Sequence, residues 1–147
     1  MVIIAHDIRS LYNVGSIFRN AAAFGVEKVF LTGITGTPPR KEIAKVALGA
    51  EELVPWEAVG IQEVIQKLRS DGYVVYGLET GEGAESIDDL SLGCSRIALV
   101  LGNEVNGLDV ETRSQLDGLI EIPMQAKRSL NVASASAVAM YALRKIL

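Results

Sequence analysis

The 147-residue chain lacks several features that would reveal its function class directly. It has one cysteine, Cys94, and one histidine, His6, so it offers no internal disulfide and no Cys/His cluster for zinc. We expect no metal, assign neither residue a function, and take the lone cysteine to favour a reducing compartment, the cytoplasm. No apolar run approaches the ~20 residues that span a bilayer, and the short apolar start suits neither a signal peptide nor an anchor.

The chain also lacks a large excess of charge of either sign. The 14 basic and 18 acidic side chains give a net charge of -4. This balance excludes a uniformly basic nucleic-acid binder but leaves room for a local basic face. Hydrophobic residues make up 49% and charged residues 22% of the chain, which is typical of a globular protein. The length predicts a single domain, residues 1–147.

Strand and helix patterns alternate along the chain and predict an α/β fold. The expected strands cover residues 2–6, 29–32, 73–78, 97–101 and 119–122, with a further short strand near Leu53 and Val54. The expected helices cover the residues from a cap at Asn13 to a stop at Gly25, then about 41–48, 61–71, 109–116 and 131–147. Strands that are apolar on both faces predict a parallel sheet with helices on both faces. Ligands bind such sheets beyond the carboxyl ends of the strands.

The first segment of interest is NVGSIFRN, residues 13–20. Gly15 permits close approach of another backbone or of a ligand. Arg19 lies about 240° around a helix from Asn13, so the two can contact one ligand only if Asn13 lies off the helix as its cap. The simpler interpretation of this segment is a capped helix with an exposed arginine.

The second segment, LVLGNEVNGL, covers residues 99–108. A strongly apolar strand runs into Gly102, which leaves the backbone free to contact a bulky ligand, and Glu104 places a carboxylate at the strand end. The glycine spacing is neither that of a dinucleotide-binding turn nor that of a phosphate-binding P-loop.

The third segment covers residues 122–143. Pro123 ends a strand, and either Ser129 or Asn131 can cap the helix that follows. The small residues at 133–139 indicate close helix packing, within the domain or across a dimer.

Taken in this order, the segments resemble the motifs of the SpoU/TrmH family of RNA ribose 2′-O-methyltransferases, in the SPOUT superfamily. The matching residues are Asn13, Gly15, Ile17 and Arg19, then Leu101, Gly102, Glu104 and Gly107, and finally 122–124 and 129–132. The chain departs from the pattern at Ala126 and Ala133, where many members have glycine and serine. The resemblance covers essentially the whole chain, and the length is that of the bare catalytic domain, so we expect no additional RNA-recognition region.

The resemblance implies a deep trefoil knot in the C-terminal part of the chain, at about residues 97–147, and a homodimer. It also implies that S-adenosylmethionine binds inside the knot, largely through backbone groups. Carried over to this sequence, the cofactor-binding residues are Leu78, Glu79, Gly102, Ile122, Met124, Ser129 and Leu130.

The implied reaction transfers a methyl group to a ribose 2′-hydroxyl. We expect Arg19, from its own subunit or a partner, to stabilise the developing alkoxide, because a guanidinium pKa above about 12 makes it a poor base. The other implied catalytic residues, which orient the arginine and the ribose, are Asn13, Glu104, Ser129 and Asn131. Glu104 is the candidate if a carboxylate accepts the proton.

The implied substrate is RNA, and family frequency favours tRNA over rRNA. The cations expected to contact its phosphates are Arg9, Arg40, Lys41, Lys45, Lys127 and Arg128. One alternative is an RNA-binding module of the same fold that has lost catalysis. Another is a small-molecule enzyme on a nucleotide-binding sheet, which the missing dinucleotide and P-loop patterns disfavour.

Overall fold

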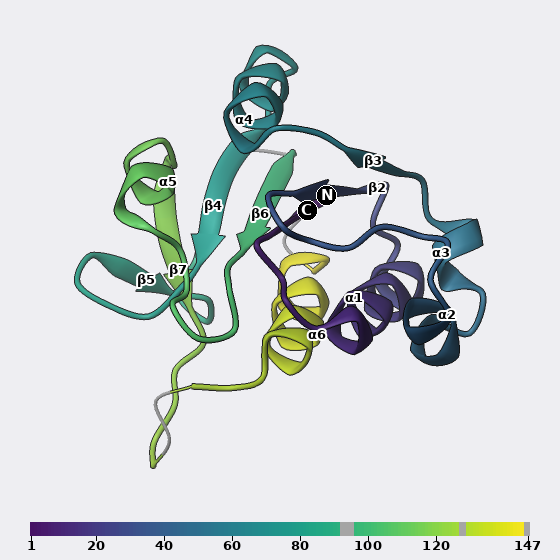
Figure 1. The fold of residues 1–147 in the computed structure, drawn as a ribbon. Helices are drawn as coiled ribbons and strands as arrows, with labels where there is room; N and C mark the ends of the chain where they lie inside the picture. The colour runs from purple at the N-terminus through teal and green to yellow at the C-terminus, as the bar shows by residue number, and fades with distance from the viewer. Residues whose placement is uncertain (92–95, 127–128, 146–147) are drawn as a thin grey trace.

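The computed structural model describes residues 1–91, 96–126 and 129–145, and its strands form one sheet (Figure 1). The strands are β1 (Val2–His6), β2 (Lys28–Thr32), β3 (Trp56–Ala58), β4 (Val74–Leu78), β5 (Ala84–Ser86), β6 (Ile97–Leu101) and β7 (Gly118–Glu121). The helices are α1 (Leu11–Phe24), α2 (Lys41–Ala47), α3 (Ala50–Leu53), α4 (Ile61–Ser70), α5 (Val110–Ser114) and α6 (Val132–Leu143). Every pairing between these strands is parallel, in the order β3-β2-β1-β6-β4-β7-β5. All carboxyl ends therefore lie at one edge.

Two hydrophobic clusters cover the two faces of this sheet. In β1, Ile3 and Ala5 pack with residues of α1, α2 and α6, whereas Val2 and Ile4 pack with residues of α4. The central strand β6 alternates in the same way and is buried along its whole length. Figure 1 shows α1 and α6 on one side of the sheet and α4 on the other. The predicted α/β architecture is confirmed.

At the edges of the sheet, one predicted strand was misplaced and one strand was not predicted. Leu53 ends the short helix α3 and is 77% exposed, and the strand comes later, at β3, where it pairs with β2. The acidic loop after β4 contains an additional strand, β5, which pairs with β7 at the edge of the sheet. Both errors have the same cause, since short edge strands bury little and so lack a clear apolar pattern.

The prediction that Asn13 caps α1 was also wrong. The cap is Ser10, whose hydroxyl accepts a hydrogen bond from the Asn13 amide at 3.3 Å, so Asn13 lies in the first turn of the helix. The predicted stop at Gly25 is confirmed, because this residue adopts a left-handed φ of 72°. Both Ser10 and Asn13 have cap-forming side chains, and only the folded backbone distinguishes them.

Helices α1 and α6 begin at the carboxyl edge of the sheet and pack against one another. Asn20 of α1 donates its side-chain amide to the Ala133 carbonyl at 2.8 Å. A Cβ on Gly15 would lie 2.5 Å from the Ile43 carbonyl, so this glycine permits close packing of α1 against α2 and not the approach of a ligand. Among the described helices, none is long and apolar enough to cross a bilayer. The knot remains a prediction.

Candidate functional site

Two adjoining hollows open at the carboxyl ends of β4, β6 and β7, and we call them together the strand-end pocket. Their volumes are about 110 and 170 Å³, and they share walls at Leu78, Glu79, Ser129 and Leu130. Ile122 and Met124 line the first hollow, and Gly102 lines the second. The structure thus brings all the predicted cofactor-binding residues to one pocket, although they come from three separate stretches of the chain.

A second depression, the helix-end pocket, lies beside the first. It has a volume of about 470 Å³ and is lined by Arg9, Ser10, Asn13, Glu104, Val105 and Asn131. Glu104 and Val105 also line the strand-end pocket, so the two depressions meet at these residues. Three of the predicted catalytic residues therefore line the depression that adjoins the predicted cofactor pocket, and a fourth, Ser129, lines the cofactor pocket itself.

A chain of hydrogen bonds connects the three sequence motifs at the helix-end pocket. The Asn13 side-chain amide donates to Glu104 Oε1 at 3.0 Å, and the Asn131 side-chain amide donates to Asn13 Oδ1 at 3.1 Å. Asn131 in turn caps α6, since its Oδ1 accepts from the Ala133 and Ser134 amides at 2.9 and 3.4 Å. Asn131 is therefore the capping residue of the two that the sequence left open. The starts of α1 and α6 are fixed relative to the loop after β6.

The Glu104 carboxylate occupies the N-terminal end of α1. Its two oxygens accept hydrogen bonds from the Arg9 and Ser10 amides, each at 2.9 Å, in addition to the Asn13 side chain. Burial opposes ionisation of Glu104, but these hydrogen bonds outweigh it and hold its pKa below the ordinary value of 4.5. A carboxylate with a lowered pKa is a weaker base, so this environment favours a positioning role for Glu104 over proton acceptance.

The loop from Gly102 to Leu108 folds tightly upon itself. A Cβ on Gly102 would lie 2.7 Å from the carbonyl carbon of Gly107. The backbone of Gly107 therefore occupies the space beside Gly102 that was predicted to accommodate a ligand. Asn103 and Gly107 exchange backbone hydrogen bonds at 3.1 and 2.9 Å. The Asn103 side-chain amide also donates to the Asp7 carbonyl at 2.8 Å, which ties the loop to the end of β1.

An ion pair that the sequence did not reveal holds the far end of this loop. Glu79 Oε2 accepts the Leu108 amide at 3.0 Å and lies 3.4 Å from Arg113 Nη2. The Arg113 Nε donates to the Leu108 carbonyl at 2.8 Å. Glu79 therefore shapes the strand-end pocket through bonds to the protein itself, and Arg113 is the residue that completes this arrangement.

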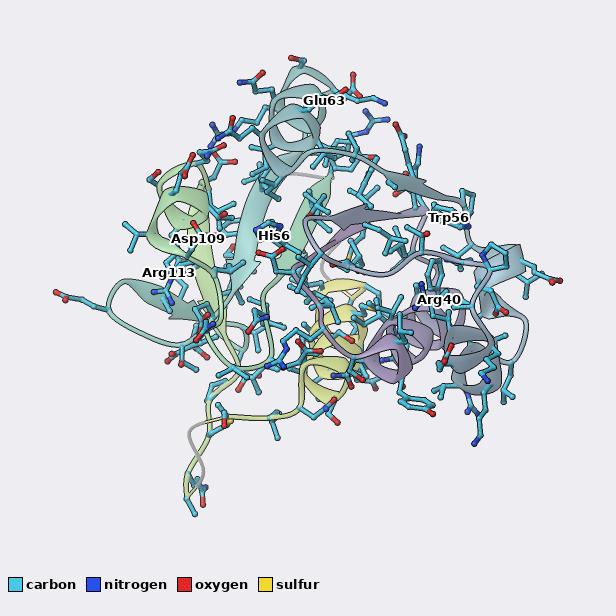
Figure 2. The ribbon with its side chains drawn as sticks, viewed as in Figure 1. His6, Arg40, Trp56, Glu63, Asp109 and Arg113 are labelled. Carbon is cyan, nitrogen blue, oxygen red and sulfur yellow. The ribbon has the colours of Figure 1, made fainter. Side chains whose placement is uncertain are left out.

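His6 also has a structural setting at this edge of the sheet. Its side chain is 8% exposed, with Nδ1 2.9 Å from Thr32 Oγ1 and Nε2 3.4 and 3.7 Å from the Asp7 and Asp109 carboxylates. Figure 2 shows His6 and Asp109 close to one another. Hydrogen bonds from the Thr112 amide and hydroxyl, with a smaller electrostatic contribution from His6, outweigh the effect of burial and lower the pKa of Asp109. These contacts connect the end of β1 to the start of α5.

The predicted catalytic arginine lies apart from both pockets. Arg19 is an exposed residue of α1, and it is not among the residues that line the strand-end or helix-end pocket. Because Asn13 lies in the helix and not at its cap, the side chains of Arg19 and Asn13 leave the helix axis in directions about 120° apart. Within its own chain, Arg19 is therefore not placed beside the predicted cofactor pocket.

The predicted RNA-binding cations that the structure describes do not line a single pocket. Arg9 lines the helix-end pocket. Arg40 and Lys41 line a separate depression of about 430 Å³ together with Glu51, Glu52 and Trp56. Figure 2 shows Arg40 and Trp56 away from His6 and Asp109. Lys45 lies on α2 and is exposed, and Lys127 and Arg128 lie outside the described residues.

Comparisons with known proteins identify the family of the chain. A sequence profile described as the SpoU rRNA Methylase family matches residues 1–141. The chain is 33% identical over 143 residues to the "23S rRNA (guanosine-2'-O-)-methyltransferase RlmB" of Xanthomonas axonopodis pv. citri, covering 96% of this chain and 57% of that protein. It is 34% identical to the protein of the same name from Vibrio vulnificus, with the same coverage. The chain thus spans little more than half the length of these relatives.

A solved structure shows the same fold. The AdoMet-bound rRNA methyltransferase from Sinorhizobium meliloti superimposes with a TM-score of 0.92 at 26% identity. The match covers 99% of this chain and 56% of the other.

Proposed function

We propose, since the chain belongs to the SpoU rRNA methylase family, that it transfers a methyl group from S-adenosylmethionine to a ribose 2′-hydroxyl of RNA. The observation that supports this most directly is the convergence of Leu78, Glu79, Gly102, Ile122, Met124, Ser129 and Leu130 on one pocket. The relatives from Xanthomonas and Vibrio carry the name of such an enzyme. The similar structure from Sinorhizobium contains bound AdoMet.

The residues of the strand-end pocket suit S-adenosylmethionine. Leu78, Ile122 and Leu130 offer apolar side chains for the adenine ring, and the strand ends offer backbone groups for hydrogen bonds. The cofactor would supply an electrophilic methyl group on a sulfonium and would leave as S-adenosylhomocysteine. The proton of the ribose hydroxyl would pass to solvent water, since its lowered pKa makes Glu104 a weak base. The protein's part is to hold the methyl group and the ribose oxygen in line, and such positioning contributes roughly 7–11 kcal/mol to comparable reactions.

On the acceptor side, the helix-end pocket would receive the ribose. Its rigid hydrogen-bond chain through Asn13 and Asn131 orients polar groups without a strong base, since Glu104 has a lowered pKa. We propose that Arg19 of a second copy of the chain reaches this pocket and stabilises the developing alkoxide. Arg19 is exposed and does not line the strand-end pocket of its own chain, which supports this arrangement in a homodimer.

RNA is the proposed substrate because only RNA carries the 2′-hydroxyl. Family frequency favours tRNA, whereas the names of the relatives favour ribosomal RNA. Among the predicted cations that the structure describes, Arg9 lines the helix-end pocket. It would hold a phosphate next to the target ribose.

The test is methyl transfer from labelled S-adenosylmethionine to unmodified rRNA and tRNA, followed by mapping of the label. We expect label on a ribose oxygen, and loss of transfer in Arg19→Ala with cofactor binding retained. Retained RNA binding without any transfer by the unaltered chain would instead support the RNA-binding module.

A mixing experiment tests the partner's contribution. Arg19→Ala lacks the cation, and Gly102→Val lacks room beside Gly107, so each variant alone should be inactive. Mixed dimers should regain part of the activity, because one of their two sites combines an intact pocket with an intact arginine. No recovery in verified mixed dimers would contradict supply of Arg19 by the partner.

A further inference from the structure

Val105 lies at the border between the two pockets, and most of its surface is not covered by other residues of the protein. Its exposed fraction is 71%. Together with Glu104 it lines both the strand-end and the helix-end pocket. The Glu104 side chain is engaged with the start of α1, so Val105 is the apolar group at this border.

The position of Val105 is imposed by a well-ordered turn. Asn103 Oδ1 accepts hydrogen bonds from the Val105 amide at 2.9 Å and from the Asn106 amide at 3.0 Å. The turn is closed by the backbone pair of Asn103 and Gly107 and is tied to Asp7. These bonds hold the side chain outwards, so its exposure follows from the geometry of the loop.

We propose that Val105 contacts both substrates at once and becomes buried between the methyl donor and the target ribose. This inference rests on the proposed function. A rigid apolar side chain at this place would fix the separation of the two reactants and exclude water from the space between them. The loss of one methylene-sized contact in such a pocket changes kcat/KM by roughly tenfold to 200-fold.

The experiment compares Val105→Thr, Val105→Ala and Val105→Ile with the unaltered chain in the RNA methyl-transfer assay. We expect kcat/KM for RNA to fall by roughly tenfold to 100-fold in the threonine and alanine variants and to be kept in the isoleucine variant. Donor affinity measured by calorimetry without RNA should change less than about threefold, because the ribose side of the contact is then missing. Thermal stability should be unchanged in all of them, since the side chain is exposed.

Val110→Thr is the matched control. Val110 is 84% exposed on α5 and lines neither pocket, so the same substitution there should leave transfer unchanged. Full kcat/KM in Val105→Thr, or an equal loss in Val110→Thr, would overturn the inference while leaving the proposed function standing. Absence of transfer by the unaltered chain would overturn the proposed function and this inference with it.

Discussion

Replacing Glu104 with glutamine tests whether this carboxylate stabilises the site by capping α1. Glutamine keeps the size of the side chain but turns one acceptor oxygen into an amide group. That group would face the Arg9 amide or the donors from Ser10 and Asn13, each of which now lies within 3.0 Å of a carboxylate oxygen. Hydrogen bonds to a charged group contribute about 1.5–3 kcal/mol, and a charge at a helix start adds about 0.3–1 kcal/mol. We expect Glu104→Gln to lower the free energy of unfolding by about 2–3 kcal/mol at neutral pH.

The stabilisation by Glu104 depends on pH because only its ionised form accepts all of these hydrogen bonds. The pKa of Glu104 in the folded chain lies below 4.5, so its stabilisation is complete above this ordinary value and is lost as the pH falls through the folded-state pKa. The stability difference between the two proteins should therefore be largest near neutral pH and shrink in acid.

Urea denaturation at a series of pH values measures this difference. Glu82, an exposed residue in the turn before β5, provides the matched control, and Glu82→Gln should change the free energy of unfolding by less than about 0.5 kcal/mol. Equal stability of Glu104→Gln and the unaltered chain at neutral pH would refute the capping role. A difference that persists undiminished in acid would show that ionisation is not its source.

Two further substitutions test the packing and the pocket. Gly15→Ala should lower the free energy of unfolding in urea by about 1–3 kcal/mol, because its Cβ would lie 2.5 Å from the Ile43 carbonyl; unchanged stability would mean that α1 and α2 separate easily. Arg113→Ala should weaken S-adenosylmethionine binding roughly tenfold by calorimetry, since it releases Glu79 and the Leu108 carbonyl. Arg69→Ala, which breaks the surface pair with Asp117, should leave that affinity unchanged; equal losses in both would assign the effect to general stability.

The central strands could be predicted from the sequence because a strand that is buried on both faces is a continuous run of apolar residues. Val2–His6 and Ile97–Leu101 are buried along their whole length, and the predicted first and last residues of both strands agree with the structure. The edge strands bury few side chains, so their sequences lack such an apolar run. Ala84–Ser86 resembles a polar loop, and only its pairing with β7 makes it a strand.

The site could be listed from the sequence but not assembled from it. Asn13 and Asn131 are 118 positions apart and meet through one hydrogen bond, which no local pattern encodes. Arg113 lies in an ordinary polar helix and gains its role only because Glu79 is brought beside it by β4. Both glycines were recognised: for Gly15, close approach of another backbone was one of the two predicted reasons, whereas Gly102 was assigned to a ligand but makes room for this chain's own backbone.

The occupied helix starts restrict where an RNA phosphate can bind. A helix N-terminus attracts anions through its free amides, and two such ends border the helix-end pocket. At α1, the amides of Arg9 and Ser10 are already bonded to Glu104, and at α6 those of Ala133 and Ser134 are bonded to Asn131. An additional anion at α1 would also face the Glu104 carboxylate at short range. Phosphate recognition at this pocket therefore relies less on these amides than on side-chain cations, and among the described predicted cations Arg9 lines it.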